Sequence, residues 1–498
     1  MKKYILAIDA GTTGITVLLF DNNAKIVKRT YSEFNQIYPK PGWVEHDPLE
    51  IWNTTRKLLH EIIENIDPKS IASIGITNQR ETAVVWNRLT SKPIYNAIVW
   101  QCKRTSEDCE ELILKGYSNK FKLKTGLIID SYFSGTKINW ILNNVSNAHD
   151  MAKRGELAFG TIDSWLIWNL TNGQSHLTDH TNASRTLVYN IDDKSWDTEL
   201  LDILDIPIQM LPEIKNSSDD FGLTNKSIFG VEIPISGVAG DQQSALYGQL
   251  AFEEGMIKCT YGTGCFMLTN TGENRINSQN GLLTTIACDA WGKPVYSIEG
   301  SVFIGGAVIQ WLRDELKLIN NAAETEEIAK NIDSTNGVYI VPAFIGLGAP
   351  YWDMNSRGTI SGITRGTNSS HLVRAALESI AYQVNDLLTA IQLDIGSKSS
   401  ILYVDGGASQ NDFLMQFQAD ILNIKIRRPE NIETTALGVA LLAGLFVKFW
   451  DSPDDFINIV KTNKSFVSSI SSKNRSLLLS GWEEAISKTL TKKSKSIK

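Results

Sequence analysis

The pattern that most restricts the fold of this chain occurs twice, half a chain length apart. Residues 4–20 and residues 257–268 each contain a short apolar run, a turn rich in glycine and threonine, and a second apolar run. Apolar runs separated by such turns are typical of neighbouring β-strands. We therefore expect two α/β halves with a cleft between them and a phosphate-binding turn on each wall. The repeat is weak support for duplication when taken alone.

The length and the charge of the chain narrow the possibilities further. At 498 residues the chain exceeds what a single core holds, and its length predicts two to four domains. With the two similar halves, we expect an N-terminal domain at residues 1–250 and a C-terminal domain at residues 251–498. The net charge of −7 gives no reason to expect nucleic acid or an anionic membrane as a partner. An anionic substrate would need a local basic pocket.

The first of the two turns has the composition of a phosphate-binding loop. The apolar run before it ends at Asp9, and the turn Gly11–Gly14 contains Thr12 and Thr13. Backbone N–H groups and two hydroxyls in such a turn can surround an anion. An ordinary hairpin turn would also suit glycine and threonine, so the turn alone leaves both interpretations open.

A second candidate site lies near the middle of the chain. The apolar segment 233–239 is followed by Gly240, Asp241, Gln242 and small residues that can start a helix. In an open α/β sheet, a residue at the carboxyl end of a strand faces the crevice where ligands bind. We interpret Asp241 as a catalytic base held at such a strand end. The alternative is that Asp241 only caps the following helix, a common role of aspartate.

Polar residues also follow a third strand-like run. The run Ile71–Ile76 leads into Arg80 and Glu81. Adjacent charges of this kind usually form a solvated surface pair. Here the apolar residues 83–86 follow directly, so both sides of the dipeptide look buried. Trp100 ends another strand-like run, and it is the tryptophan that we place near the site.

Several classes of protein are excluded by motifs that the chain lacks. It has no P-loop motif, no complete dinucleotide fingerprint, and no catalytic-loop or Asp-Phe-Gly motif of protein kinases. His176 and His180 have i,i+4 spacing, but their surroundings are loop-like, and such a pair binds metal only on a stable helix. We therefore expect no metal site at these histidines.

The remaining features indicate a soluble, cytoplasmic protein. The five cysteines form no CxxC pair, which reduced thiols in a cytosolic enzyme explain most simply. The N-terminal apolar run is too short for a signal-peptide core. The longest apolar run, Ala436–Val447, is far short of a bilayer span, and its glycines and alanines indicate a close-packed buried helix.

Short motifs run along almost the whole chain. They are Asp9-Ala-Gly-Thr-Thr13, Asn78-Gln-Arg-Glu-Thr82, Trp100-Gln-Cys-Lys-Arg104, Tyr132-Phe-Ser-Gly-Thr-Lys137, Gly240-Asp-Gln-Gln243, Tyr261-Gly-Thr-Gly-Cys-Phe266, Ala349-Pro-Tyr-Trp-Asp353 and Asp405-Gly-Gly-Ala408. Their order resembles the FGGY carbohydrate kinases, within the larger actin-like ATPase fold. The Arg-Glu dipeptide and Gly-Asp-Gln-Gln are the specific part, and they match the family members that phosphorylate glycerol.

The resemblance implies an α/β fold with two actin-like (ribonuclease H-like) domains and a central catalytic cleft. It implies ATP-dependent phosphorylation of glycerol to sn-glycerol 3-phosphate, the first step of glycerol catabolism. The N-terminal domain would bind glycerol and phosphate, and the C-terminal domain would bind the nucleotide. The implied polyol contacts are Arg80, Glu81, Tyr132, Asp241 and Gln242, with Trp100 and Phe266 along the carbon edge. The implied nucleotide contacts are Thr12, Thr13, Gly14 and Thr263 at the phosphates, and Gly306, Gln310, Gly407 and Asn411 at the nucleoside.

The resemblance also implies how the reaction proceeds. Asp241 would accept the proton of the attacking hydroxyl, while Mg²⁺, held through water by Asp9 and Asp241, would bridge phosphate oxygens. Closure of the lobes would exclude water and so limit wasteful ATP hydrolysis. The implied partners are glycerol and ATP, in a homodimer or homotetramer, with no nucleic acid and no membrane insertion.

The chain departs from the family pattern in places that matter for function. Family members commonly have Ser-Ser-Arg after the two threonines, whereas this chain has Gly14-Ile15-Thr16. An arginine contact to the nucleotide phosphates is thus lost, and Thr16 can replace it only weakly. Ser131 stands where proline is usual. The loop 224–231 lacks the Gly-Lys-Gly…Arg pattern that binds fructose 1,6-bisphosphate, and the histidine that is phosphorylated in other members, so we expect neither control.

Two other functions compete with this interpretation. One is a kinase of the same fold for another small polyol or ketose. The other is a non-catalytic actin-like ATP module, such as a filament or chaperone lobe. Such a module would keep the Asp-x-Gly-Thr turn but has no reason to combine Arg80 and Glu81 with Tyr132 and Asp241. Those four residues favour the enzyme.

Overall fold

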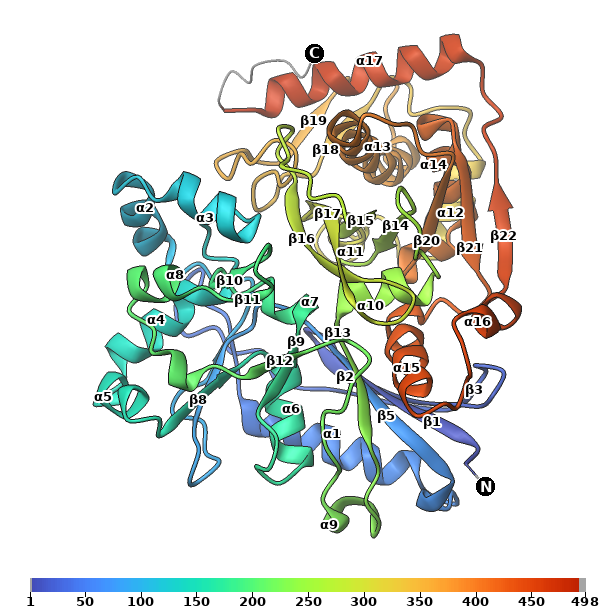
Figure 1. Cartoon of the computed structure of the whole chain (residues 1–498). Helices are drawn as coiled ribbons and strands as arrows, with labels where there is room; N and C mark the ends of the chain where they lie inside the picture. The colour runs from blue at the N-terminus through green and yellow to red at the C-terminus, as the bar shows by residue number, and fades with distance from the viewer. Residues whose placement is uncertain (1, 492–498) are drawn as a thin grey trace. The chain divides into compact units, whose positions relative to one another are not determined.

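The computed structural model describes residues 2–491, which form two compact units (Figure 1). Within these residues, the first unit contains 2–252, 284–296 and 434–460, and the second contains 253–283, 297–433 and 461–491. Two later segments of the chain therefore return to the first unit. The boundary expected between residues 250 and 251 remains a prediction.

A five-stranded mixed sheet, in the order β13-β5-β1-β2-β3, forms the centre of the first unit. β1 is antiparallel to β2 and parallel to β5, and β5 is parallel to β13. The strands and the main helices beside them are β1 (Tyr4–Ala10), β2 (Gly14–Phe20), β3 (Ile26–Glu33), β5 (Ile71–Asn78), β13 (Ile235–Gly240), α1 (Pro48–Ile62), α6 (Ile162–Leu170), α10 (Asp241–Gly248) and α15 (Thr434–Phe446). The predicted strand–turn–strand unit at residues 4–20 is confirmed by β1 and β2.

Alternate residues of β1 pack on opposite faces of this sheet, as the two-residue period of a strand requires. Leu6 and Ile8 belong to the core formed with α1 and α6. Ile5 and Ala7 belong to the core formed with α15. Helices therefore cover both faces of the sheet at β1.

The helix α15 is the buried helix predicted for residues 436–447. All side chains from Ala436 to Leu445 are buried. A Cβ atom added to Gly438 would lie 1.9 Å from the Ser244 carbonyl oxygen, and one added to Gly75 would lie 2.3 Å from the Val439 carbonyl oxygen. Gly438 thus lets α15 approach α10 closely, and Gly75 lets β5 approach α15 closely. Within residues 2–491, no helix combines the length and the apolar character needed to cross a membrane.

Shorter elements complete the first unit. They are β4 (Glu45–His46), η1 (Pro68–Ser70), β6 (Val84–Asn87), β7 (Ala97–Ile98), α2 (Ser106–Leu114), α3 (Ser118–Thr125), α4 (Ser134–Asn144), α5 (Ala148–Lys153), β8 (Leu157–Gly160), β9 (Leu177–Asp179), α7 (His180–Ala183), β10 (Tyr189–Asn190), β11 (Ser195–Trp196), α8 (Thr198–Ile203), η2 (Ile208–Met210), β12 (Glu213–Lys215), α9 (Lys226–Phe229) and α16 (Asp454–Ile459).

The second unit is built on a seven-stranded sheet in the order β16-β17-β15-β14-β20-β21-β22, in which most of β16 and the first residues of β17 belong to the segment 284–296 assigned to the first unit. β14 is antiparallel to β15 and parallel to β20, the same pairing that β1 makes with β2 and β5. The repeat noticed in the sequence is therefore present in the strand pairing. The elements are β14 (Ile257–Tyr261), β15 (Cys265–Gly272), β16 (Leu283–Cys288), β17 (Pro294–Val302), α11 (Ala307–Asp314), α12 (Glu324–Lys330), β18 (Tyr339–Val341), β19 (Thr359–Ser361), α13 (Ser369–Ile395), β20 (Ile401–Asp405), η3 (Gly407–Gln410), α14 (Asp412–Leu422), β21 (Lys425–Pro429), β22 (Thr462–Phe466) and α17 (Ser472–Thr489).

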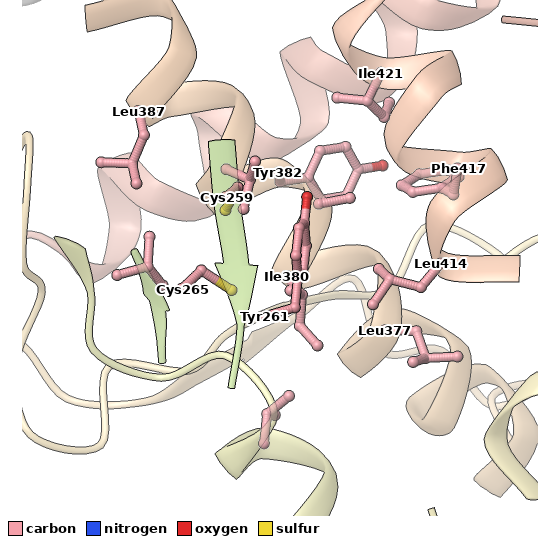
Figure 2. Packing of buried hydrophobic residues seen from close by; sticks show 14 of the residues in the cluster. Cys259, Tyr261, Cys265, Leu377, Ile380, Tyr382, Leu387, Leu414, Phe417 and Ile421 are labelled. Carbon is pink, nitrogen blue, oxygen red and sulfur yellow. The ribbon is translucent and has the colours of Figure 1, made fainter. Parts of the chain in front are cut away.

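The core of the second unit lies where β14 meets α13 and α14. Figure 2 shows Tyr261 of β14 pointing toward Tyr382 of α13 and Phe417 of α14. The Tyr261 hydroxyl donates to Gln418 Oε1 at 2.8 Å, and the Tyr382 ring packs edge-on against Phe417 at 5.5 Å. Because Tyr261 is the last residue of β14, this packing fixes the start of the glycine-rich turn that follows it.

Candidate active site

The Gly11–Gly14 turn joins β1 to β2 and is held by side chains from other parts of the first unit. The Trp100 indole N–H donates to Thr12 Oγ1 at 3.0 Å. The Gln79 amide donates to the Gly11 carbonyl at 3.2 Å. Thr12 is half-buried, and the threonine that follows it is exposed. The turn is thus fixed in shape while one of its hydroxyls remains accessible.

The carboxyl ends of three parallel strands lie side by side in the first unit. Asn78 of β5 is the register partner of Ala10 in β1 and of Gly240 in β13. The arginine–glutamate pair at 80–81 and Asp241 come directly after two of these strand ends. They therefore share one edge of the sheet, the edge where ligands bind in open α/β folds.

Arg80 lies between two carboxylates at this edge. Arg80 is 3% exposed and Glu81 is 1% exposed, so the alternative of a solvated surface pair is wrong. Arg80 Nε lies 3.2 Å from Asp241 Oδ1 and 3.9 Å from Glu81 Oε1. Arg80 Nη1 also donates to Gln243 Oε1 at 3.2 Å. The arrangement offers a buried cation and two acceptor carboxylates to a ligand that carries hydroxyl groups.

Asp241 is the first residue of α10, and its position bears on the capping alternative. The N-cap residue of α10 is Gly240, which has no side chain to cap the helix. Asp241 Oδ1 accepts from the Gln242 N–H at 2.7 Å, so the carboxylate does satisfy one of the free N–H groups of the first turn. The Asp241 side chain is 29% exposed and also faces Arg80. The carboxylate is therefore open to a ligand and is not occupied by capping alone.

Aromatic rings lie next to this group of charges. The Trp100 and Tyr132 rings meet edge-on at 5.6 Å, and Tyr132 packs against Phe133 at 4.9 Å. The Tyr132 N–H donates to Asp130 Oδ1 at 2.8 Å, and Lys137 Nζ donates to the Tyr132 carbonyl at 2.5 Å. Complete burial lowers the pKa of Lys137 to about 7. These bonds fix the backbone that carries the Tyr132 ring.

A cavity of about 500 Å³ opens in the second unit at the end of β14. Its apolar wall includes Ile309, Leu377, Ile380 and Leu414. Its lining includes residues that the sequence predicted as nucleotide contacts: Thr263, Gly306, Gln310, Gly407 and Asn411. The volume of the cavity and its mixture of apolar and polar lining residues suit a small molecule.

Comparison with known proteins places the chain in a family. The N-terminal domain of the FGGY family of carbohydrate kinases matches residues 4–248, and the C-terminal domain of the same family matches residues 257–446. The chain belongs to the FGGY family of carbohydrate kinases.

Several members of the family can be aligned with this chain over almost their whole length. The glycerol kinase of Thermoanaerobacter sp. (strain X514) is 57% identical over 492 residues, which cover 98% of this chain and 99% of that protein. The glycerol kinase of Carboxydothermus hydrogenoformans is 58% identical over 490 residues, 98% of each. The crystal structure of Plasmodium falciparum glycerol kinase with ADP superposes with a TM-score of 0.91 at 41% identity, over 98% of both chains. These matches confirm the predicted two-domain α/β fold.

The remaining predicted site residues of the chain are divided between the two units. Asp9 on β1 and Thr16 on β2 are register partners, and Thr16 also faces Tyr31 on β3. Gln242 follows Asp241 in α10 and is 8% exposed. Phe266 lies on β15, in the second unit. The first unit thus brings its predicted polyol residues to one sheet edge, and the second brings the predicted nucleoside residues to one cavity.

The stretch 176–183 was expected to be a loop. It contains β9 and α7 instead. The His176 ring bonds the Phe159 carbonyl through Nε2 at 2.7 Å, and the His180 ring bonds the Tyr189 hydroxyl through Nδ1 at 2.7 Å. Burial lowers the pKa of both histidines to about 4, so both rings are neutral at pH 7. Across residues 2–491, no group of three or more His, Cys, Asp or Glu side chains could hold a metal ion.

Arg185 is the functional candidate that the sequence patterns did not indicate. It follows α7 closely, its side chain is fully buried, and its Nε donates to Glu81 Oε1 at 2.6 Å. The guanidinium carbon lies 5.6 Å from the centre of the Tyr132 ring. The local signal was an arginine two residues before the apolar run 187–189, and such a signal is too common to identify a site.

Proposed function

We propose that this protein transfers the γ-phosphoryl group of ATP to glycerol and so forms sn-glycerol 3-phosphate, the first step of glycerol catabolism. The observation that carries the proposal is Arg80, buried between the carboxylates of Glu81 and Asp241 at the strand ends. A small polyol offers little except hydroxyl groups, so charged partners of this kind are needed to recognise it. Relatives named glycerol kinase, at 57% and 58% identity over almost the whole chain, support the same substrate.

The proposed polyol site uses both the charges and the aromatic rings. Its hydroxyl partners are Arg80, Glu81, Tyr132, Asp241 and Gln242, and its carbon edge packs on Trp100 and Phe266. The edge-on packing of Trp100 against Tyr132 supports this division, because it presents an indole beside a phenolic hydroxyl. An apolar surface next to polar partners suits a molecule that has hydroxyls on one side and carbons on the other.

The proposed nucleotide site uses both glycine-rich turns. The nucleoside would occupy the cavity of about 500 Å³ in the second unit. Its phosphates would contact the backbone and hydroxyls of Thr12, Thr13, Gly14 and Thr263, with Thr16 nearby on β2. A nest of backbone N–H groups is a common way to bind phosphate oxygens. The similar Plasmodium falciparum structure contains ADP, which supports an adenine nucleotide.

We include Mg²⁺ in the proposal as the partner of the nucleotide phosphates. Asp9 and Asp241 are the residues that would hold it; Asp9 lies on β1 and Asp241 directly follows β13, and these two strands flank β5. Carboxylate oxygens suit Mg²⁺, and this ion usually keeps several waters, so two carboxylates without further protein ligands fit its chemistry. When bound, the ion neutralises charge on the transferred phosphoryl group.

In the proposed reaction, Asp241 accepts the proton of a glycerol hydroxyl. The hydroxyl oxygen then forms a bond to the γ-phosphorus of ATP, the bond from this phosphorus to the bridging oxygen breaks, and ADP leaves with that electron pair. Arg80 stabilises the negative charge of the Asp241 carboxylate and orients it, since the two side chains lie 3.2 Å apart. Most of the catalysis would come from positioning and charge neutralisation, as is usual for phosphoryl transfer.

Purified protein tests the proposal directly. With ATP and Mg²⁺, we expect phosphorylation of glycerol to exceed that of dihydroxyacetone, erythritol and xylulose, with glycerol 3-phosphate identified by mass spectrometry. Replacing Asp241 with Asn should lower kcat by about 100-fold or more, because a general base is lost. Full turnover in Asp241→Asn would exclude this mechanism.

The panel also decides between the proposal and its alternatives. Preference for another polyol or a ketose would establish a kinase of the same fold with a different substrate. No phosphorylation of any member, combined with binding of ATP, would favour a non-catalytic actin-like module.

We propose a cytoplasmic homodimer or homotetramer as the setting of this reaction, because ATP is produced and consumed inside cells. Light scattering after size-exclusion chromatography measures the assembly.

A further inference from the structure

The short helix α7 and the arginine that follows it, Arg185, contact the strand ends and the glutamate of the predicted polyol site. Figure 1 shows α7 beside β9 and β13. None of these residues was expected to have a role in binding. Their contacts with the residues proposed to bind glycerol suggest one.

The position of α7 is fixed by a buried carboxylate. Asp179 accepts from the backbone N–H of Thr181 and of Asn182, both at 3.0 Å, and from the Ser217 hydroxyl at 2.8 Å. Asp179 is fully buried, and each of these bonds satisfies one of its oxygens or one of the free N–H groups of the helix. The helix therefore cannot rotate without breaking several buried bonds.

The same helix bonds to the ends of both strands that carry the polyol residues. The Gly240 N–H donates to Thr181 Oγ1 at 2.9 Å, immediately before Asp241. The Asn78 side chain donates to Asn182 Oδ1 at 3.0 Å, immediately before the segment with Arg80. α7 thus sets the relative position of these two strand ends.

Arg185 adds a charge to this arrangement. Its Nε donates to Glu81 Oε1 at 2.6 Å, whereas Arg80 Nε is 3.9 Å from the same oxygen and 3.2 Å from Asp241. Positive and negative groups therefore alternate along the row Arg185, Glu81, Arg80, Asp241. A hydrogen bond at 2.6 Å between ionised partners is stronger than an ion pair at 3.9 Å, so the Glu81 carboxylate is held more tightly by Arg185 than by Arg80.

The guanidinium of Arg185 also packs against aromatic rings. Its central carbon lies 5.6 Å from the centre of Tyr132 and 5.3 Å from the centre of Phe133. A cation over an aromatic face within about 6 Å is attracted to it. One side chain thus touches two predicted polyol contacts, Glu81 and Tyr132.

We propose that Arg185 is a positioning residue for glycerol binding, an inference that rests on the function proposed above. Arg185 neutralises Glu81 and holds its carboxylate in place, which leaves Arg80 directed toward Asp241. It also supports the Tyr132 ring. Without Arg185, Glu81 competes with Asp241 for the guanidinium of Arg80. The side chains proposed to bind the polyol hydroxyls then no longer have fixed positions.

Steady-state kinetics of Arg185→Met and Arg185→Lys test this inference. We expect Arg185→Met to raise the KM for glycerol by about 10-fold or more, the usual effect of losing a hydrogen bond to a charged group. The KM for ATP should change by less than about twofold, because Glu81 and the two rings that Arg185 contacts are not among the predicted nucleotide residues. Arg185→Lys should recover part of the loss, since lysine keeps the charge but loses the planar fork.

A double-mutant cycle with Glu81→Gln tests whether Arg185 acts through the carboxylate. In the Glu81→Gln background, Arg185→Met should raise the glycerol KM less than it does in the wild type, because the charge that Arg185 balances is already gone. A merely structural arginine would have the same effect in both backgrounds. Additive effects would therefore overturn the inference.

Arg104 provides a matched control in the same unit. Its side chain is also fully buried, pairs with Glu45 at 2.6 Å and packs on Trp43 with its guanidinium carbon 3.9 Å from the ring centre. Arg104→Met should lower the melting temperature but leave the glycerol KM unchanged. Equal effects of the two variants on the glycerol KM would overturn the inference, as would joint changes in the KM for glycerol and ATP.

Calorimetric binding of glycerol separates this inference from the proposed function. If the wild-type protein turns over no glycerol but binds it, a weaker affinity in Arg185→Met would still support the positioning role. If the wild type neither phosphorylates nor binds glycerol, both proposals fail. If it does both and the Arg185 variants bind glycerol as the wild type does, only the inference on Arg185 fails.

Discussion

Glu81 combines burial, charge and an unusual backbone. Its φ of 59° lies in the left-handed region that L-residues other than asparagine and aspartate rarely adopt. Ser134 Oγ donates to the Glu81 carbonyl at 2.9 Å, and Arg185 holds the side chain at 2.6 Å. Such backbone strain costs about 1–3 kcal/mol and is found mainly at functional sites. The surrounding bonds keep Glu81 in this conformation, consistent with the polyol contact proposed for it.

Thr16 allows a test of the nucleotide site at a single position. It lies opposite Asp9 on β1 and Tyr31 on β3, where family members commonly have arginine. We expect Thr16→Arg to lower the KM for ATP by roughly 3- to 10-fold at saturating glycerol, because a guanidinium binds phosphate oxygens in pairs. Ser32→Arg is the control, since Ser32 pairs with Ile15 and points to the other face of the sheet. An unchanged KM in Thr16→Arg, or an equal decrease in the control, would contradict this prediction.

The helix α13 is tied to its surroundings by a buried carboxyl group. Asp386 Oδ2 accepts from the Tyr351 hydroxyl at 2.9 Å and from the Trp482 indole N–H of α17 at 2.8 Å. Burial raises the pKa of Asp386 to about 7, while the two donors oppose that rise. The carboxyl group therefore joins α13 to α17 and also makes the stability of the second unit depend on pH.

Asp386→Asn should remove this pH dependence. In the wild type the pKa is about 7 when folded and about 3.9 when unfolded, so the folded state binds the proton more tightly. Its contribution to stability is complete below about pH 4 and is lost as the pH rises to about 7, by roughly 4 kcal/mol at most. Asparagine stays neutral and still offers an acceptor oxygen. The free energy of unfolding in urea, measured at pH 5 and pH 8, should fall less in Asp386→Asn than in the wild type.

An exposed carboxylate provides the comparison for Asp386. Asp333 lies on the surface of the second unit, beyond α12. Asp333→Asn should keep the pH dependence of the wild type. Identical pH profiles for the wild type and Asp386→Asn would show that the carboxyl group of Asp386 does not titrate in this range.

The chain as a whole is acidic, so anionic ligands depend on local cations. The net charge is −7, and the buried arginines Arg80 and Arg185 are matched by the carboxylates of Glu81 and Asp241. The two units have separate cores, and each contains its own group of predicted site residues. A regulatory phosphate ester would therefore need a basic surface outside the predicted polyol site and outside the predicted nucleoside site.

Fructose 1,6-bisphosphate is expected to leave the activity unchanged at millimolar concentration. The loop 224–231 forms α9, and its lysine, Lys226, is paired with Glu232 at 3.6 Å. The test compares the initial rate of glycerol phosphorylation with and without millimolar fructose 1,6-bisphosphate. A cavity of about 580 Å³ beside α9 is lined by Arg56, Lys57 and His60, so inhibition would contradict the prediction and direct attention to that cavity. Arg56→Ala would then test whether the inhibitor binds there.

Local patterns in the sequence predicted much of the fold. The strand–turn–strand units, the strand at residues 71–76 and the buried helix α15 were all indicated by apolar runs, turn residues and small side chains. The positions of Arg80, Glu81 and Asp241 after strand ends also followed, because the end of a strand can be read from where its apolar run stops, whereas the polyol contacts came from the family resemblance and stay a prediction. These features depend on chemistry within about ten residues of each position, which the linear chain records.

Tertiary packing decided the features that depend on residues far apart in the chain. The return of residues 434–460 to the first unit and the bond from Arg185, just after α7, to Glu81 were not visible in any local pattern. Arg185 is 104 positions from Glu81 in the sequence, and nothing in the residues around either one indicates the other. Which of many arginines neutralises a buried carboxylate is a matter of geometry, and that geometry exists only once the strands and helices have packed together.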